Sequence, residues 1–242
     1  MRSWDSECVC RIELRNFPAI DIFSGSVVRL TQGDYNKVEK YAITPVEAAT
    51  IFREKGAMNL HIVDLDGAKD GNLSNFESIR EVVCSTKMFV EVGGGIRDQK
   101  RIENYLSIGV SRVILGTAAI KNFAFLTEMV KEYGEKIAVG VDAKNGLAAV
   151  DGWVNLTDTD SVSFCERVLG IGCKSVIYTD IERDGKMLGT NLDIYKRLSQ
   201  IKGLEITASG GISSLDEIKA LSRMGIHSAI IGKAIYEGKL NL

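Results

Sequence analysis

The segment GGGIRDQKRIENYLSIGVSRVILGTAA (residues 93–119) decides the fold, because the chain repeats it as SGGISSLDEIKALSRMGIHSAIIGKAI (residues 209–235). The two segments align without a gap at a spacing of 116 residues and share eight identical positions. Half of the shared positions are glycine pairs: Gly94/Gly210, Gly95/Gly211, Gly109/Gly225 and Gly116/Gly232. A repeat of this length predicts a fold built from two similar halves.

A second motif pair supports the same division. PAIDIFSG (18–25) resembles VGVDAKNG (139–146), and their alignment pairs Asp21 with Asp142. Each of these aspartates ends an apolar run, where an unpaired buried charge would be costly. Two opposed carboxylates suit a reaction that removes a proton from one atom and delivers one to another. The alternative is that one or both carboxylates only hold loops by hydrogen bonding.

A third motif pair also contains aspartates. VDLDGAKDG (63–71) resembles IYTDIERDG (177–185), and alignment of their Asp-Gly dipeptides pairs Asp66 with Asp180. Aspartate commonly caps a turn, so we expect loop capping more than chemistry from four of the aspartates in these segments. They are Asp64, Asp66, Asp180 and Asp184.

Short apolar runs alternate with amphipathic segments along the chain. Their nearly continuous apolar character predicts strands that are buried on both faces of a parallel sheet. TPVE (44–47) and SLDE (214–217) carry the N-terminal capping boxes of two of the intervening helices. Eight such units predict a (β/α)8 barrel, with a doubly wound open sheet as the alternative. The expected strands are 17–22, 60–65, 88–92, 112–115, 137–141, 175–179, 205–208 and 228–231.

The composition excludes several classes of protein. The 242 residues are 45% hydrophobic and 26% charged with a net charge of -2, which does not favour nucleic acid or an anionic membrane as a partner. No apolar run approaches the roughly 20 residues that span a bilayer. Five scattered cysteines without a C-x-x-C motif indicate reduced thiols of a cytoplasmic protein, not a disulfide framework or a zinc site. We expect residues 1–16 to be an extension and 17–242 to form one barrel domain, a monomer.

Glycine segments at strand ends predict where a ligand binds. In such barrels the carboxyl ends of the strands form the active face, and bare backbone N–H groups at a helix start attract anions. Two clusters predict a small-molecule substrate with a phosphate at each end, unless these glycines only turn the chain. The clusters are Gly94, Gly95, Ile96, Gly116 and Thr117 in one half, and Gly210, Gly211, Ile212, Gly232 and Lys233 in the other.

Other polar residues near the strand ends are weaker candidates. Thr179 and Ser209 are expected substrate contacts, and Arg29 and Arg97 are candidate contacts to phosphate or substrate. Trp153 either closes over a substrate or packs against the protein. No metal site is expected, because the two histidines, His61 and His227, lack a carboxylate or cysteine at ligand spacing.

The ordered motifs resemble one known family. FPAIDIFSGSVVRLTQGDY, LHIVDLDGAKDG, VEVGGGIRD, VILGTAA, GVDAKNGLAAVDGW, YTDIERDGKMLGTN, ASGGISS and IIGKAIYEG together resemble the phosphoribosylformimino aminoimidazole carboxamide ribotide (ProFAR) isomerases of histidine biosynthesis. The resemblance implies a (β/α)8 barrel that converts an aminoaldose to an aminoketose by an Amadori rearrangement, without a metal or an organic cofactor. It implies that Asp21 is the general base, that Asp142 is the general acid, and that Thr179 positions the sugar. It also implies that the glycine clusters hold the phosphates and that Trp153 stacks on the substrate.

Four alternatives stay open, and one of them is some other barrel enzyme that acts on phosphorylated sugars. The cyclase of imidazole glycerol phosphate synthase is also a duplicated barrel, but it typically has cysteine and lysine where this chain has Ala19 and Arg29. Some relatives of the isomerase also act on phosphoribosyl anthranilate. A non-catalytic binder of sugar phosphates would be expected to lack the strand-end carboxylates, and both are present here.

Overall fold

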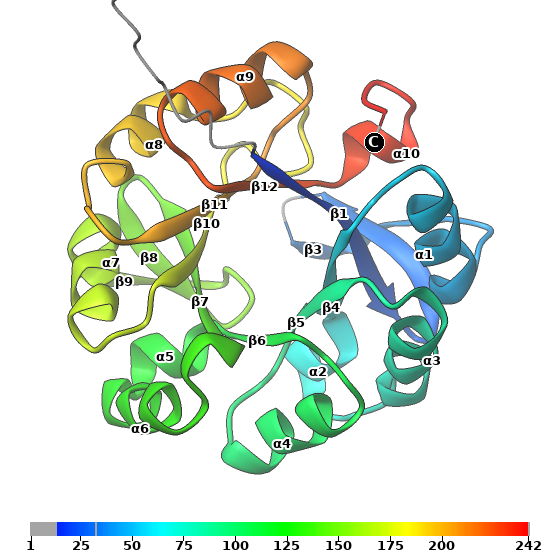
Figure 1. The fold of residues 1–242 in the computed structure, drawn as a ribbon, viewed down its shortest axis with the longest axis horizontal. Coiled ribbons are helices and arrows are strands. Elements are labelled where there is room, and N and C mark those ends of the chain that lie inside the picture. Colours follow the sequence, from blue (N-terminus) through cyan, green and yellow to red (C-terminus); the bar gives the residue numbers. More distant parts are fainter. Residues whose placement is uncertain (1–13, 32, 242) are drawn as a thin grey trace, which may run out of the picture.

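The computed structural model describes residues 14–31 and 33–241, and within them eight parallel strands close into a barrel (Figure 1). Neighbouring barrel strands pair in parallel, and the last of them pairs with the first. The predicted (β/α)8 barrel is confirmed, and the open doubly wound sheet is wrong. The barrel strands are β1 (Arg15–Phe23), β4 (Asn59–Asp64), β5 (Phe89–Gly93), β6 (Arg112–Leu115), β7 (Ile137–Lys144), β10 (Ser175–Asp180), β11 (Glu205–Ser209) and β12 (Ser228–Ile231).

The first strand begins earlier than the sequence pattern predicts. Arg15 and Asn16 pair with β12 and belong to the barrel, so the expected boundary of the extension at residue 16 is wrong. The apolar pattern misses them because both are polar residues at the rim of the barrel. The expectation of an extension over residues 1–13 lies outside the described residues.

A ring of helices surrounds the barrel, and the main hydrophobic core lies between the two layers (Figure 1). A smaller apolar cluster, built around Phe17, Ile114 and Ile177, fills part of the barrel interior. Within the described ranges, no helix is long and apolar enough to cross a bilayer. The helices are α1 (Pro45–Glu54), α2 (Leu65–Asp70), α3 (Phe76–Thr86), α4 (Gln99–Ser107), α5 (Thr117–Lys121), α6 (Phe123–Tyr133), η1 (Gly134–Lys136), α7 (Ser161–Gly170), α8 (Leu192–Leu198), α9 (Leu215–Arg223) and α10 (Lys233–Tyr236).

The two predicted capping boxes differ in outcome. Thr44 and Glu47 exchange both hydrogen bonds at the start of α1, so this box is confirmed. At the start of α9, Ser214 accepts from the backbone of Glu217 at 3.4 Å. The Glu217 carboxylate, however, accepts from the N–H of Ser213 at 3.0 Å and completes no box with Ser214.

Two hairpins extend the barrel at matched places in the two halves. β2 (Ser26–Thr31) and β3 (Asp34–Lys40) follow β1, while β8 (Leu147–Val150) and β9 (Asn155–Asp160) follow β7. Their first turns have positive φ at both central residues, which are Ser-Gly after β1 and Asn-Gly after β7. The outer strands β3 and β9 are polar and largely exposed, so the hydrophobic pattern does not predict them. Asn145-Gly146 before β8 and Asp151-Gly152 after it are the local signals of the second hairpin.

The structure corrects one alignment between the halves. The spacing of 116 residues also relates Asp64 to Asp180, which end β4 and β10. Each accepts a hydrogen bond from an asparagine eleven residues later, Asn75 at 2.7 Å and Asn191 at 2.8 Å. Because these contacts match, the pairing of Asp66 with Asp180 is wrong, and the two Asp-Gly dipeptides align by chance.

Candidate active site

A large pocket opens at the carboxyl ends of the barrel strands, lined by residues from all eight of them and from both hairpins. It brings together all the residues that the sequence predicts for catalysis and substrate binding, although these residues are far apart in the chain. In the described part of the chain, no three acidic, histidine or cysteine side chains gather into a metal-binding group. The predicted residues that line the pocket are Asp21, Arg29, Gly94, Gly95, Ile96, Arg97, Gly116, Thr117, Asp142, Trp153, Thr179, Ser209, Gly210, Gly211, Ile212, Gly232 and Lys233.

Asp21 is held by a cation from the neighbouring hairpin. Arg29 on β2 donates from Nη1 to Asp21 Oδ2 at 2.7 Å and from Nη2 to the carbonyl of Ala19 at 3.0 Å. Its guanidinium carbon lies 5.6 Å from the centre of the Tyr236 ring. Both members of the ion pair are mostly buried, with side-chain exposures of 15% and 14%. The pair therefore fixes the orientation of the Asp21 carboxylate at the pocket wall.

Asp142 occupies the matching place on β7 in a different environment. Burial raises the pKa of its carboxyl, against hydrogen bonds from Trp153 and Thr179 and the charge of His61. Thr179 is its register partner on the adjacent strand β10. No arginine or lysine forms an ion pair with Asp142 among the described residues. Asp142 thus holds a proton more readily than an ordinary aspartate.

Asp184, between β10 and α8, also places a carboxyl in the pocket lining. Burial raises its pKa to about 6, helped by the charges of Asp21 and Asp142 and opposed by Arg29. Expecting Asp184 only to cap a turn is therefore incomplete. Nothing in its local sequence distinguishes it from an ordinary Asp-Gly turn.

His61 also lines the pocket, and sequence analysis considered it only as a metal ligand. It is two residues before Val63 on β4, which lines the pocket too, so strand alternation turns both side chains inward. That alternation is the signal that would have found His61. Its ring Nδ1 lies 2.7 Å from Glu91 Oε1, on β5.

The first glycine cluster is constrained by its neighbours as well as by any ligand. Gly94 and Gly95 have φ values of 109° and 67°. A Cβ on Gly94 would lie 2.1 Å from the carbonyl oxygen of Asp64, and one on Gly95 would lie 1.8 Å from that of Gly67. No side chain fits there, so chain packing alone requires glycine at both positions. Gly93, the last residue of β5, has ordinary space for a Cβ, as the serine at position 209 in the other half indicates.

Matched helix starts complete the two clusters. Gly116 precedes α5 with φ and ψ of -97° and -103°, and Gly232 precedes α10 with -102° and -104°. Neither has a side chain to cap the first turn, whose N–H groups lack intrahelical partners. The charges differ, because Lys233 adds a cation where the other half has Thr117, whose hydroxyl accepts from the N–H of Asp151 at 2.9 Å. Both helix starts can therefore receive an anion, and one adds a full charge.

Trp153 connects the two hairpins across the pocket. It lies in the turn between β8 and β9 with φ of 73°, and its ring packs on Gly33 beside β3. A Cβ on Gly33 would lie only 2.8 Å from the indole. With the indole also bonded to Asp142, Trp153 both packs and lines the pocket.

A closed barrel with carboxylates between two glycine clusters at its carboxyl end defines an enzyme of the (β/α)8 class. The chain matches the family described as histidine biosynthesis protein over residues 15–241, and it belongs to that family. Its relatives include a protein of Brachyspira hyodysenteriae, 49% identical over 93% of this chain and 94% of its own length. A protein of Clostridium novyi is 46% identical over the same shares. Both are named 1-(5-phosphoribosyl)-5-((5-phosphoribosylamino)methylideneamino)imidazole-4-carboxamide isomerase.

Proposed function

We propose that this chain isomerises ProFAR, the compound in its relatives' name, from an aminoaldose to an aminoketose. One observation carries the proposal: Asp21 and Asp142 face one pocket from β1 and β7, which lie four strands apart around the barrel. A glycine cluster lies to either side of them. The relatives' substrate contains two phosphoribosyl groups, and two anion-binding clusters match its two phosphates.

The proposed chemistry needs only proton transfers. Asp142 gives a proton to the ring oxygen as the bond from that oxygen to the anomeric carbon breaks, and the attached nitrogen forms a C=N bond. Asp21, held by its hydrogen bond from Arg29, takes the proton from the neighbouring carbon, and the electrons form an enaminol. Loss of the hydroxyl proton and protonation of the former anomeric carbon give the ketone. Thr179, bonded to Asp142, helps hold the sugar, and no atom is gained or lost.

Asp184 offers a second proton donor in the same scheme. A carboxyl with a pKa of about 6 is partly protonated near neutral pH and still able to give up its proton. Single substitutions distinguish the two acids: the residue that protonates the ring oxygen is the one whose loss removes turnover.

The alternative activities have less support. The cyclase pattern of Cys and Lys is absent, and Arg29 is committed to the ion pair with Asp21. Activity toward phosphoribosyl anthranilate is tested with that substrate in the same assay. We also propose that the enzyme is monomeric and cytoplasmic and needs no cofactor. Gel filtration tests its oligomeric state, and assays after chelator treatment test whether its activity is independent of metal ions.

The deciding experiment is to incubate the purified protein with ProFAR and follow the absorbance change of isomerisation. Turnover that saturates with substrate is expected, and no turnover at saturating ProFAR would contradict the proposal. Analogues that lack either phosphate should bind much more weakly than ProFAR. Equal affinity of the analogues would remove the two phosphate sites from the proposal while leaving the isomerase activity.

A further inference from the structure

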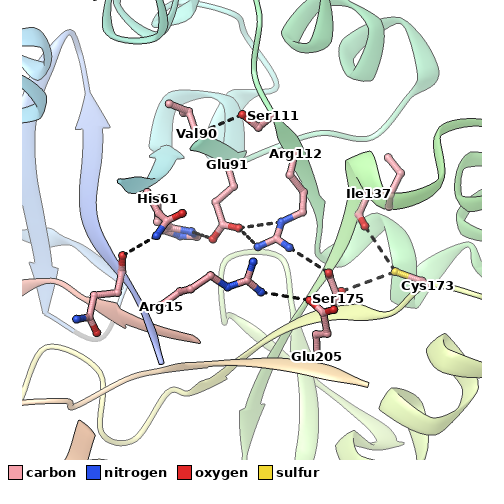
Figure 2. Close-up of polar contacts among 12 residues, drawn as sticks. Arg15, His61, Val90, Glu91, Ser111, Arg112, Ile137, Cys173, Ser175 and Glu205 are labelled. Carbon is pink, nitrogen blue, oxygen red and sulfur yellow. Dashed lines mark hydrogen bonds and ion pairs between the residues drawn. The ribbon is translucent and has the colours of Figure 1, made fainter. Parts of the chain in front are cut away.

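A buried network of charges lies below the pocket, inside the barrel (Figure 2). Its centre is Glu91 on β5, which is fully buried. The two carboxylate oxygens have separate partners: Oε1 lies 2.7 Å from Nδ1 of His61, and Oε2 accepts from Arg112 Nε at 3.0 Å and Nη2 at 2.5 Å. The network thus runs from a pocket residue on β4 to the floor of the barrel on β6.

Arg112 is itself held from three sides. Its Nη1 donates to the hydroxyl of Ser175 at 3.0 Å (Figure 2). Its guanidinium carbon lies 5.9 Å from the centre of the Phe17 ring and 5.3 Å from that of Phe89. These contacts leave the guanidinium little freedom, so Glu91 is anchored from below.

Filling space does not account for this arrangement. The adjacent part of the interior is filled by the apolar cluster around Phe17, Ile114 and Ile177. A buried ion pair adds little net stability compared with apolar residues of similar volume, because desolvation offsets the attraction. A role in positioning explains why charges occupy this side of the barrel.

The ion pair determines where the imidazole proton lies. Burial raises the pKa of Glu91, but the hydrogen bonds from His61 and Arg112 and the charge of Arg112 outweigh it, so the pKa is lowered overall. An ionised carboxylate only accepts hydrogen bonds, so Nδ1 of His61 must carry the hydrogen. The other ring nitrogen, Nε2, is then the one available to the pocket, and it bonds to no other group among the described residues.

We propose that Glu91, anchored by Arg112, is a positioning residue that fixes His61 with its hydrogen on Nδ1, so that Nε2 accepts a hydrogen bond from a substrate hydroxyl. The part that concerns the substrate rests on the proposed isomerase function. The tautomer of His61 does not, and it is tested separately.

The first test needs no substrate. The chain has two histidines, so ¹⁵N-labelled histidine gives signals from two rings, and a His227→Gln variant assigns them. In the wild-type protein, the ring of His61 is expected to carry its hydrogen on Nδ1 and none on Nε2. In a Glu91→Leu/Arg112→Met variant, which removes both charges together, this preference should be lost. Hydrogen on Nε2 in the wild type would overturn the proposal, whether or not ProFAR is turned over.

The second test separates positioning from folding. Because the Glu91→Leu/Arg112→Met variant leaves no unpaired charge, it should unfold near the wild-type temperature while its kcat for ProFAR falls about 10- to 100-fold. The matched control, Arg15→Gln/Glu205→Gln, removes the exposed ion pair of the same barrel floor and should keep wild-type kcat. A folded charge-free variant with wild-type kcat would overturn the proposal.

A double-mutant cycle shows whether Glu91 acts through His61. His61→Gln alone and His61→Gln combined with the charge-free pair should have the same kcat, because the pair then has no imidazole left to position. Independent, multiplicative losses would overturn the proposal by showing that the pair acts on the site by another route. If no variant or wild-type protein turns over ProFAR, the isomerase function fails, and the NMR result still decides the tautomer.

Discussion

The two halves of the barrel place an aspartate at the same strand end but surround it differently. Asp21 forms an ion pair with Arg29, whereas Asp142 has the neutral donors Trp153 and Thr179. Burial among neutral groups raises the pKa of the Asp142 carboxyl and so favours its protonated form. The two halves thus hold matched carboxylates in different surroundings, and this difference supports the proposed roles of Asp21 as base and Asp142 as acid.

The largest expected effect is a loss of kcat when either aspartate is replaced. Asp21→Asn and Asp142→Asn should each lower kcat by about 10²- to 10⁴-fold, because asparagine keeps the shape but exchanges no proton. Steady-state kinetics with ProFAR and a thermal unfolding scan measure activity and folding together. Asp158→Asn, on the exposed strand β9, is the control and should be neutral. Near-normal kcat in either site variant would remove that residue from its assigned role.

The next largest effect compares the two glycine turns. Gly95→Ala should destabilise the fold by about 3 kcal/mol or more, since its Cβ would overlap the carbonyl oxygen of Gly67. At the matched Gly211, the nearest atom is the carbonyl oxygen of Gly189 at 2.6 Å, so Gly211→Ala should cost less. Urea unfolding of both variants measures the difference. Equal losses would mean that the two turns are equally tight and would contradict this asymmetry.

The sequence predicts those features that depend on local pattern or on the repeat. Eight apolar runs predict eight barrel strands because each is buried on both faces. Gly94 and Gly210 mark two loops because no residue with a side chain fits their backbone contacts. Asp21 and Asp142 are predicted because a carboxylate contrasts with the apolar run that it ends.

The remaining site residues depend on contacts that the sequence does not show. By the Asp-Gly motif Asp184 resembles Asp70, yet Asp70 is exposed at the end of α2 and Asp184 lines the pocket. His61 and Glu91 are thirty residues apart, and only the pairing of β4 with β5 joins them. The polar outer strands of the hairpins are stabilised by pairing at the barrel mouth, so no periodic apolar pattern marks them.

The contrast between Asp184 and Asp70 can be tested through the pH dependence of stability. Its folded pKa of about 6 lies above the ordinary value of 3.8, so the folded state binds this proton more tightly than the unfolded chain. The resulting stabilisation is fully present below about pH 4 and is lost as the pH rises through 6. Relative to the wild type, Asp184→Asn should gain about 2 kcal/mol at pH 8, after a discount for partial exposure, and should lose that advantage at pH 4. Urea unfolding at both pH values checks this, and Asp70→Asn should show no such shift.

The smallest expected effect concerns two residues of opposite charge that each hold the glycine turn of their half by hydrogen bonds. Positions 101 and 217 are separated by the same 116 residues; Arg101 donates to the carbonyl of Gly95 at 2.7 Å, whereas Glu217 accepts from the N–H groups of Thr190 and Ser213. Each ties the glycine turn of its half to the rest of the loop region.

Hydrogen bonds to Glu217 outweigh the effect of its burial and lower its pKa, so its contribution to stability is present above its ordinary pKa and is lost as the pH falls through the lowered value. Glu217→Gln should therefore cost about 1 kcal/mol at neutral pH, because the amide oxygen still accepts, and the loss should shrink in acid. Arg101→Gln should cost a similar amount at every pH, since arginine does not titrate in this range. Urea unfolding at pH 7 and pH 4 distinguishes the two. A pH-independent loss for Glu217→Gln would show that the charge of Glu217 does not hold its loop.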